Sequence, residues 1–455
     1  MKIKALLLFL FALLSIQNVN AGDEQKKLAV TVYNQNLGVI KDVRTFSIKN
    51  GESTISLTDV AQFIDPTSVH IKLEGAVLEQ NYQYDLVSVD KILQKYIDKN
   101  VQLLGKNGEL IEGKLLSSYG AQVVLQKNEG GLLMIPNINE YRFSVESLPE
   151  GLKTKPTLVW TVSSPKTGNQ DVEVTYQTNG MNWHAEYVAL LNKDDTALDL
   201  NSWVSVENQS GTTYKDAKLK LIAGDINMIQ EQPTVYMNGL RRAKTMSIEA
   251  DEQFAEKSFF EYHIYNLKRP TTLANNETKQ ISLFESNNVK AGKKFYYKSF
   301  NNYGGTIQGK VSVVVEFINS SDDGLGVPMP KGKVRVYKHD GESVEFVGED
   351  LIDHTPIKEK VKLKIGDAFD IVVEDKQTEN NKITDKVFEK VWEVTLKNRK
   401  KENVVVDVEK YLGSGWKVIS SNFDFSEKDS QNIQIRVPVK ADDETTLKLK
   451  VRFTN

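Results

Sequence analysis

Few residue groups in this 455-residue chain have the types and spacing that catalysis or cofactor binding requires. Gly304 to Lys310 reads GGTIQGK, which matches the first part of a phosphate-binding loop. Such a loop needs Ser or Thr after the lysine, followed by a helix whose N-terminus faces the phosphates. Here Val311 follows and begins the apolar run VSVVVEF, which is typical of a strand. We therefore interpret the segment as a glycine-rich hairpin turn and assign no cofactor.

The histidines do not have the spacing of a metal site. The chain contains five, and none lies in an HxxxH or HExxH pattern. His184 and His263 each directly follow an aromatic residue in a predicted strand, which favours a structural role. His354 precedes Thr355-Pro356, which indicates a turn. We assign no metal ligands, although a site built from separated strands remains an alternative.

Hydrolase signatures are equally sparse. No GxSxG sequence occurs, so a nucleophile elbow is unsupported. A glycosidase needs two carboxylates at a set separation, but 61 acidic residues make any chosen pair uninformative. The segment from Asn192 to Asp195 lacks the glycine and closing glutamate of a calcium loop, so we expect a polar hairpin. Without cysteine, a disulfide scaffold, a zinc finger and a thiol enzyme are excluded. We assign no catalytic residues.

Two groups of residues form a candidate binding face. Aromatic residues gather between positions 259 and 265 and between positions 295 and 303. Successive strand residues face opposite sides, so half should lie in the core and half could bind a sugar or a protein. The second group is a polar loop predicted at 230–256. The candidate residues are Tyr262, Tyr265, Tyr297, Arg241 and Arg242. The alternative is a buried core beside a solvated loop.

The first 21 residues have the pattern of a secretory signal peptide. Lys2 and Lys4 precede an apolar run of ten residues, and small side chains at Val19 and Ala21 predict cleavage between Ala21 and Gly22. The run is too short for a spanning helix. No later segment is apolar for 18 residues, so we expect no transmembrane segment in the mature chain. We expect a periplasmic or extracellular protein.

Charge and composition describe an ordinary globular chain. Hydrophobic residues make up 40%, and 58 basic residues against 61 acidic ones give a net charge of −3. Loss of Lys2 and Lys4 with the signal peptide changes this charge to −5. Nothing here favours a nucleic acid as a partner.

Alternating apolar and polar residues, rich in Val, Ile, Thr and Tyr, predict strands over nearly the whole chain. One helix is predicted after Ser88, a candidate N-cap, and five short strands follow it closely. A further short helix is expected near 252–257. The fold class is mainly β, with multi-domain antiparallel β-sandwiches, a small SH3/Sm-like barrel and one short helix before the barrel.

The predicted organisation has five parts. They are the signal peptide (1–21), an N-terminal β unit (22–86), the helix with its barrel (87–149), a central β-sandwich region (157–380) that contains the 230–256 loop, and a C-terminal immunoglobulin-like sandwich (381–455).

Several strings resemble a bacterial and archaeal family of secreted all-β proteins known as a domain of unknown function, distantly related to mucoidy-inhibitor-like proteins. They include VTVYNQNLGVIKDVRTF (30–46), GMNWHAEYVALL (180–191), LGVPMPKGKVRVYKHD (325–340) and FVGEDLIDHTPIKEKVKLKIGDAFDIV (346–372). The resemblance implies no assigned activity. Relatives often carry a coiled coil after the N-terminal β unit, where this chain has the predicted barrel.

From these observations we expect an exported, non-catalytic envelope protein that binds an unknown protein or glycan through β-sheet surfaces. Two alternatives remain: a hydrolase acting on cell-wall or polysaccharide substrates, and a structural factor in envelope assembly.

Overall fold

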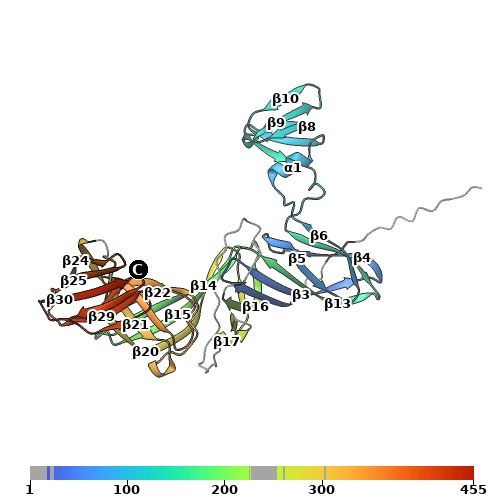
Figure 1. Ribbon diagram of the computed structural model, residues 1–455. Helices are drawn as coiled ribbons and strands as arrows, with labels where there is room; N and C mark the ends of the chain where they lie inside the picture. The colour runs from blue at the N-terminus through green and yellow to red at the C-terminus, as the bar shows by residue number, and fades with distance from the viewer. Residues whose placement is uncertain are drawn as a thin grey trace, which may run out of the picture. The chain divides into compact units, whose positions relative to one another are not determined.

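The computed structural model of the protein describes residues 18–20, 25–224, 226, 254–259, 262–301 and 304–454. Strands dominate these residues, and the one α-helix among them is α1 (Val89–Lys95), so the prediction of a mainly β fold is confirmed (Figure 1). The chain divides into two compact units, which are described separately. Unit 1 comprises Met1–Asn182, Glu207–Lys220 and Pro270–Glu277, and unit 2 comprises Trp183–Val206, Leu221–Arg269 and Thr278–Asn455.

Apart from the small module described below, unit 1 contains strands of two sheets that follow the expected alternation. One sheet has the order β1-β4-β12-β6, and the other contains the run β16-β2-β3-β13-β5, with β19 paired to β16. Strand β13 pairs antiparallel with β3 without interruption, and its burial alternates from Val172 onward, where Val172, Val174 and Tyr176 face the core. The strands are β1 (Asn18–Asn20), β2 (Gln25–Tyr33), β3 (Gly38–Ile48), β4 (Gly51–Thr58), β5 (Ile64–Lys72), β6 (Ala76–Gln83), β12 (Thr157–Ser164), β13 (Gly168–Thr178), β16 (Tyr214–Ala223) and β19 (Thr271–Leu273).

Helix α1 and five strands form a small module with its own core, in the order that the sequence predicted. The Ser88 hydroxyl accepts a hydrogen bond from the Lys91 backbone N–H at 3.3 Å, which confirms the N-cap. The sheet order is β10-β9-β8-β7-β11, and α1 lies beside this sheet (Figure 1). Leu93 and Tyr96 of this segment pack into the module core. Closure into a barrel remains a prediction. The elements are β7 (Asn100–Gly105), β8 (Leu110–Tyr119), β9 (Gln122–Lys127), β10 (Leu132–Ile135), the 3-10 turn η1 (Ile138–Glu140) and β11 (Tyr141–Ser144).

Unit 2 is built on one large sheet in the order β23-β22-β14-β15-β20-β21-β24-β25-β30-β27. Strand β26 pairs with both β20 and β29, and β28 pairs with β29. The first elements are β14 (Met181–Leu191), β15 (Ala197–Asn208), β17 (Phe254–Phe259), β18 (Tyr262–Leu267), β20 (Glu277–Ser299), β21 (Gly305–Ile318), the 3-10 turn η2 (Ser321–Asp323), β22 (Gly332–His339) and β23 (Val344–Ile352). The remaining strands are β24 (Lys360–Thr384), β25 (Val387–Asn398), β26 (Val404–Tyr411), β27 (Trp416–Ser421), β28 (Phe425–Glu427), β29 (Asn432–Val439) and β30 (Glu444–Thr454).

The C-terminal core extends beyond the boundary predicted at residue 381. Its buried residues include Trp392, Val406 and Ile435, as expected for a sandwich, and also Tyr297 and Val373 from β20 and β24. Strand β24 crosses that boundary, and β20, which ends at Ser299, pairs with β21 along 291–296 and with β26 along 295–299. The C-terminal core therefore includes strands of the predicted central region.

Two segments that were expected to form a short helix and a turn are strands in the structure. The short helix expected near 252–257 is wrong where the structure describes that segment, because β17 pairs antiparallel with β18 from Phe254 to Phe259. The interpretation of GGTIQGK as a hairpin turn is wrong for most of the segment, because residues 305–310 lie inside strand β21, where Lys310 pairs with Val372 of β24.

Candidate functional site

Three neighbouring strands of unit 2 bring basic side chains onto one sheet face. In the register, Gly292 of β20 lies opposite Glu316 of β21, and Glu316 lies opposite Lys362 of β24. Because directly opposed residues point to the same side of a sheet, these three positions share a face. Lys294 lies two residues beyond Gly292, and Lys360 lies two residues before Lys362, so both join that face.

Glu316 is the centre of this group. Its carboxylate accepts a hydrogen bond from the Tyr296 hydroxyl at 2.6 Å. It also lies 3.0 Å from Lys294 Nζ, 3.1 Å from Lys362 Nζ and 3.8 Å from Lys360 Nζ. The glutamate side chain is 5% exposed, whereas each lysine is about half exposed. A buried carboxylate thus holds three solvent-facing ammonium groups together.

These contacts keep Glu316 ionised. Burial alone would raise the pKa of its carboxyl, but the hydrogen bond from Tyr296 and the two nearest lysines outweigh burial and lower the pKa to about 2. Burial and the neighbouring Glu316 raise the pKa of the Tyr296 phenol well above its usual value. The carboxylate is negative and the phenol is neutral at every physiological pH.

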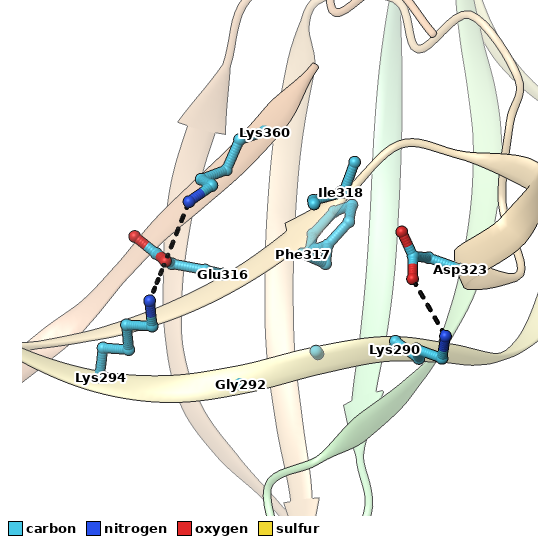
Figure 2. Close-up of a pocket in the computed structure, with 9 residues that line it drawn as sticks. Lys290, Gly292, Lys294, Glu316, Phe317, Ile318, Asp323 and Lys360 are labelled. Atoms are coloured by element: carbon cyan, nitrogen blue, oxygen red, sulfur yellow. Dashed lines mark ion pairs between the residues drawn. The ribbon is translucent and has the colours of Figure 1, made fainter. Parts of the chain in front are cut away.

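A shallow hollow of about 240 Å³ lies beside Glu316, and we call it the Glu316 hollow (Figure 2). Gly292 forms part of its floor, and a Cβ atom there would meet no atom within 4 Å. Lys290 lies at its rim, 3.3 Å from Asp323. Its lining residues are Lys290, Ala291, Gly292, Lys294, Glu316, Phe317, Ile318, Asp323 and Lys360.

The hollow and its margin carry an excess of positive charge. Lysines 290, 294, 360 and 362 surround two carboxylates, those of Glu316 and Asp323. Two positive charges therefore remain uncompensated within this group. Ile318, which is 41% exposed, adds an apolar surface to the lining. The arrangement suits an anionic group attached to a partly apolar body.

The prediction that Tyr265 and Tyr297 belong to an exposed binding face is wrong, because both side chains are buried and only 4% exposed. The Tyr297 hydroxyl donates a hydrogen bond to buried Asp375 at 3.0 Å, and the outward residue of that strand is its neighbour Tyr296. Tyr262 is half-buried, and a side chain at Gly224 would collide with its ring. The structure therefore does not bring these tyrosines together on an open face.

The remaining predicted positions lie outside the described residues. These positions are the cleavage residues Ala21 and Gly22, together with Arg241 and Arg242 of the polar loop. Of the 230–256 loop, the structure describes residues 254–256, which belong to β17.

The histidines have neighbours of a structural kind. His263 Nδ1 lies 2.7 Å from Glu256 across the β17–β18 hairpin, and His184 Nε2 lies 3.6 Å from Glu186. His354 Nδ1 accepts a hydrogen bond from the backbone N–H of Lys331 at 3.1 Å. Among the described residues, no three His, Asp or Glu side chains group in the manner of a metal site.

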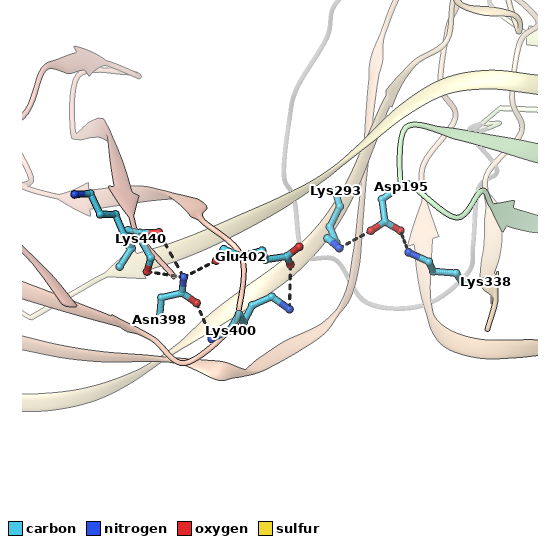
Figure 3. A network of polar contacts seen from close by, with 8 residues as sticks. Asp195, Lys293, Lys338, Asn398, Lys400, Glu402 and Lys440 are labelled. Atoms are coloured by element: carbon cyan, nitrogen blue, oxygen red, sulfur yellow. Dashed lines mark hydrogen bonds and ion pairs between the residues drawn. The ribbon is translucent and has the colours of Figure 1, made fainter. Parts of the chain in front are cut away.

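The polar hairpin predicted from Asn192 to Asp195 is present and anchored. Asn192 Oδ1 accepts hydrogen bonds from the backbone N–H groups of Thr196 and Ala197, which fixes the turn. Asp195 forms ion pairs with Lys293 of β20 and Lys338 of β22 (Figure 3). These lysines outweigh burial and lower the pKa of Asp195. The hairpin is a structural clamp with both lysines engaged.

A second buried polar cluster lies inside the C-terminal core. Lys410 Nζ, on a side chain that is 1% exposed, donates to Ser299 Oγ at 2.9 Å and to the Asn301 carbonyl at 2.7 Å. The Ser299 hydroxyl donates in turn to Asp375. Lys410 Nζ also lies 4.5 Å from the centroid of the Trp392 ring. Burial lowers the pKa of Lys410 to about 8.

The Glu316 hollow is not among the sites predicted from the sequence, although its lysine pattern is visible in the chain. Lysines at 290 and 294, and at 360, 362 and 364, have the spacing of residues on one side of a strand. The two groups of lysines are more than 60 residues apart along the chain. Only the pairing of β20, β21 and β24 brings them together.

One family model matches this chain, over residues 172–454, and no curated protein matches it. The matched range contains all three strands of the Glu316 hollow. The distant relation to mucoidy-inhibitor-like proteins remains a prediction. None of the described helices is long and apolar enough to cross a membrane. Because the match covers more than half of the chain, the protein belongs to the family described as "Domain of unknown function (DUF4139)".

Proposed function

We propose that this protein is exported and binds a macromolecule of the cell envelope through a β-sheet surface, without catalysing a reaction. The observation that carries the proposal is the Glu316 hollow, which presents exposed lysines around a carboxylate held permanently ionised. A general acid or base works best with a pKa near the operating pH. A pKa of about 2 makes Glu316 a poor proton donor or acceptor but a good anchor for lysines.

Export is supported by the signal-peptide pattern of residues 1–21. Cleavage between Ala21 and Gly22 would remove Asn18–Asn20, which form β1 beside β4. The test is to express the full chain in a bacterium, recover the protein outside the cytoplasm and sequence its N-terminus. We expect a chain that begins at Gly22, and retention of the intact N-terminus in the cytoplasm would contradict export.

Binding is tested by sedimenting the purified mature protein with isolated cell envelopes. We expect the wild type to co-sediment and the Lys294→Glu/Lys360→Glu variant to lose most of this binding, because the variant reverses the charge of the hollow. The matched control is Lys106→Glu/Lys376→Glu, which changes two exposed lysines elsewhere in the chain and should leave binding unchanged.

Two outcomes contradict the proposal. If the wild type does not co-sediment, or if both double variants bind as well as the wild type, the hollow is not a binding surface. Release of soluble fragments from the envelopes would instead favour the hydrolase alternative.

A further inference from the structure

We infer that the Glu316 hollow is a binding site for a phosphate-bearing glycan, with the phosphate between Lys294 and Lys360 and the sugar ring against Ile318. This inference rests on the proposed function and names the class of ligand.

The Glu316 hollow and its margin carry more positive than negative charges. Glu316 gathers three lysines at 3.0, 3.1 and 3.8 Å, but it neutralises only one of them. Lys290, at the rim, is paired with Asp323. A phosphate monoester carries between one and two negative charges near neutral pH, so it matches the excess of two positive charges better than a single carboxylate does. Lys360, at 3.8 Å, is the ammonium group least engaged by Glu316.

Gly292 leaves open space in the lining of the hollow. Gly292 does not have a left-handed backbone, so its conformation does not require glycine. A Cβ atom at this position would meet nothing within 4 Å, so the missing side chain leaves the space open. In the register, Gly292 lies directly opposite Glu316, which places this opening beside the charge cluster (Figure 2).

The charged groups of the hollow are held in place by their neighbours. Tyr296 donates to Glu316 at 2.6 Å, and Lys362 Nζ lies 4.8 Å from the centroid of the Tyr296 ring. These contacts hold the carboxylate and one lysine in place before any ligand arrives, which lowers the cost of ordering the site. Ile318, which lines the same hollow and is 41% exposed, supplies an apolar surface for the C–H face of a sugar ring.

The experiment measures binding of glucose 6-phosphate, inorganic phosphate and glucose to the full mature chain by titration calorimetry. We expect glucose 6-phosphate to bind most tightly, inorganic phosphate more weakly and glucose not measurably. Binding should weaken at about 1 M NaCl, where charges are screened beyond roughly 3 Å.

Two variants locate the site. Gly292→Leu fills the floor while keeping every lysine, and we expect at least about tenfold weaker binding of glucose 6-phosphate, equivalent to about 1.4 kcal/mol. The matched control is Gly366→Leu, because Gly366 also lies in a strand of this sheet with nothing within 4 Å of a built Cβ. Lys294→Gln/Lys360→Gln should weaken binding without adding bulk, so the test remains decisive if Gly292→Leu folds poorly.

Equal affinity of Gly292→Leu, Gly366→Leu and the wild type would overturn the inference. Binding of glucose as tight as that of its phosphate would overturn it too, and inorganic phosphate binding as tightly as the sugar phosphate would remove the glycan from the assignment. If envelopes retain the protein while all three small ligands fail to bind, the inference is wrong and the proposed function stands. If the sugar phosphate binds but envelopes do not retain the protein, the proposed function is wrong.

Discussion

Single residues show how this β protein handles charge in two different ways. Glu316 is a buried carboxylate that exposed lysines keep ionised, and its neighbours remain accessible to ligands. Lys410 is a buried ammonium group that is enclosed by Ser299, Asn301 and the Trp392 ring. The first arrangement suits binding, and the second suits the interior of a sandwich, where a charge must be hydrogen-bonded to be tolerated.

The burial of Lys410 predicts that the unfolding free energy of the protein changes with pH in the alkaline range. Its pKa is about 8 in the folded protein, below the ordinary value of 10.5, so the unfolded chain binds its proton more tightly. Stability contributed by this group therefore rises as the pH increases from about 8 to about 10.5. Relative to Lys410→Met, we expect the unfolding free energy of the wild type to increase by about 2–3 kcal/mol across that interval, measured by urea unfolding. Parallel pH curves for wild type and variant would contradict this, and exposed Lys376→Met should show no such difference.

Adjacent tyrosines in β20 face opposite sides of the sheet. Alternation along 295–300 correctly predicts that half of the aromatic side chains are buried, but it does not say which half. Tyr297 lies in the core and Tyr296 faces outward, because the core side of β20 is set by Phe295 and Tyr297 packing with β25, β26 and β29. Where adjacent positions are both aromatic, the sequence alone does not determine which of the two side chains faces the core.

At the scale of elements, two strands each end at a buried asparagine whose side chain makes the same set of backbone hydrogen bonds. Asn208, at the end of β15, donates to the carbonyls of Thr212, Leu273 and Ala274 and accepts from the backbone N–H of Ser210. Asn398, at the end of β25, donates to the carbonyls of Glu402, Val439 and Lys440 and accepts from the backbone N–H of Lys400 (Figure 3).

In both cases the side-chain amide binds the carbonyl four residues ahead and two consecutive carbonyls of another segment. The turn after each strand is therefore held to a second segment of chain by an amide buried to 1% exposure or less.

Removing one of these asparagine side chains should lower the unfolding free energy substantially. Asn398→Ala leaves three backbone carbonyls and one N–H without their partner, so we expect a loss of about 2–4 kcal/mol in unfolding free energy. The control is Asn381→Ala, since Asn381 is exposed and its amide contacts only the Glu379 side chain in the described structure. Thermal unfolding of both variants checks the difference, and similar melting temperatures would refute the role of Asn398.

At the scale of the whole molecule, the module of α1 and β7–β11 has a core separate from the rest of the chain. The core contains Leu93, Leu103 and Leu125, all fully buried. All five tryptophans lie outside the module, at 160, 183, 203, 392 and 416, so their fluorescence reports on the remainder of the protein.

We therefore expect Leu103→Ala to destabilise the module by about 2–4 kcal/mol while leaving the tryptophan-monitored transition unchanged. Hydrogen exchange of amides in β7 and β8 measures the module itself. A shift of the tryptophan transition equal to the shift seen by hydrogen exchange would show that the module and the remainder unfold as one unit. The matched change Leu396→Ala, in the C-terminal core, should move the tryptophan transition.

Local chemistry in the sequence was sufficient for the class of fold, the helix after Ser88, the five short strands that follow it and the polar hairpin at Asn192. Each depends on neighbours within a few residues: an N-cap, a two-residue alternation or a side chain that binds its own turn. The Glu316 hollow, the inclusion of β20 and β24 in the C-terminal core and the burial of Tyr297 were decided by tertiary structure alone. They depend on which distant strands pair and in which register, and a register is set by long-range packing of whole sheet faces.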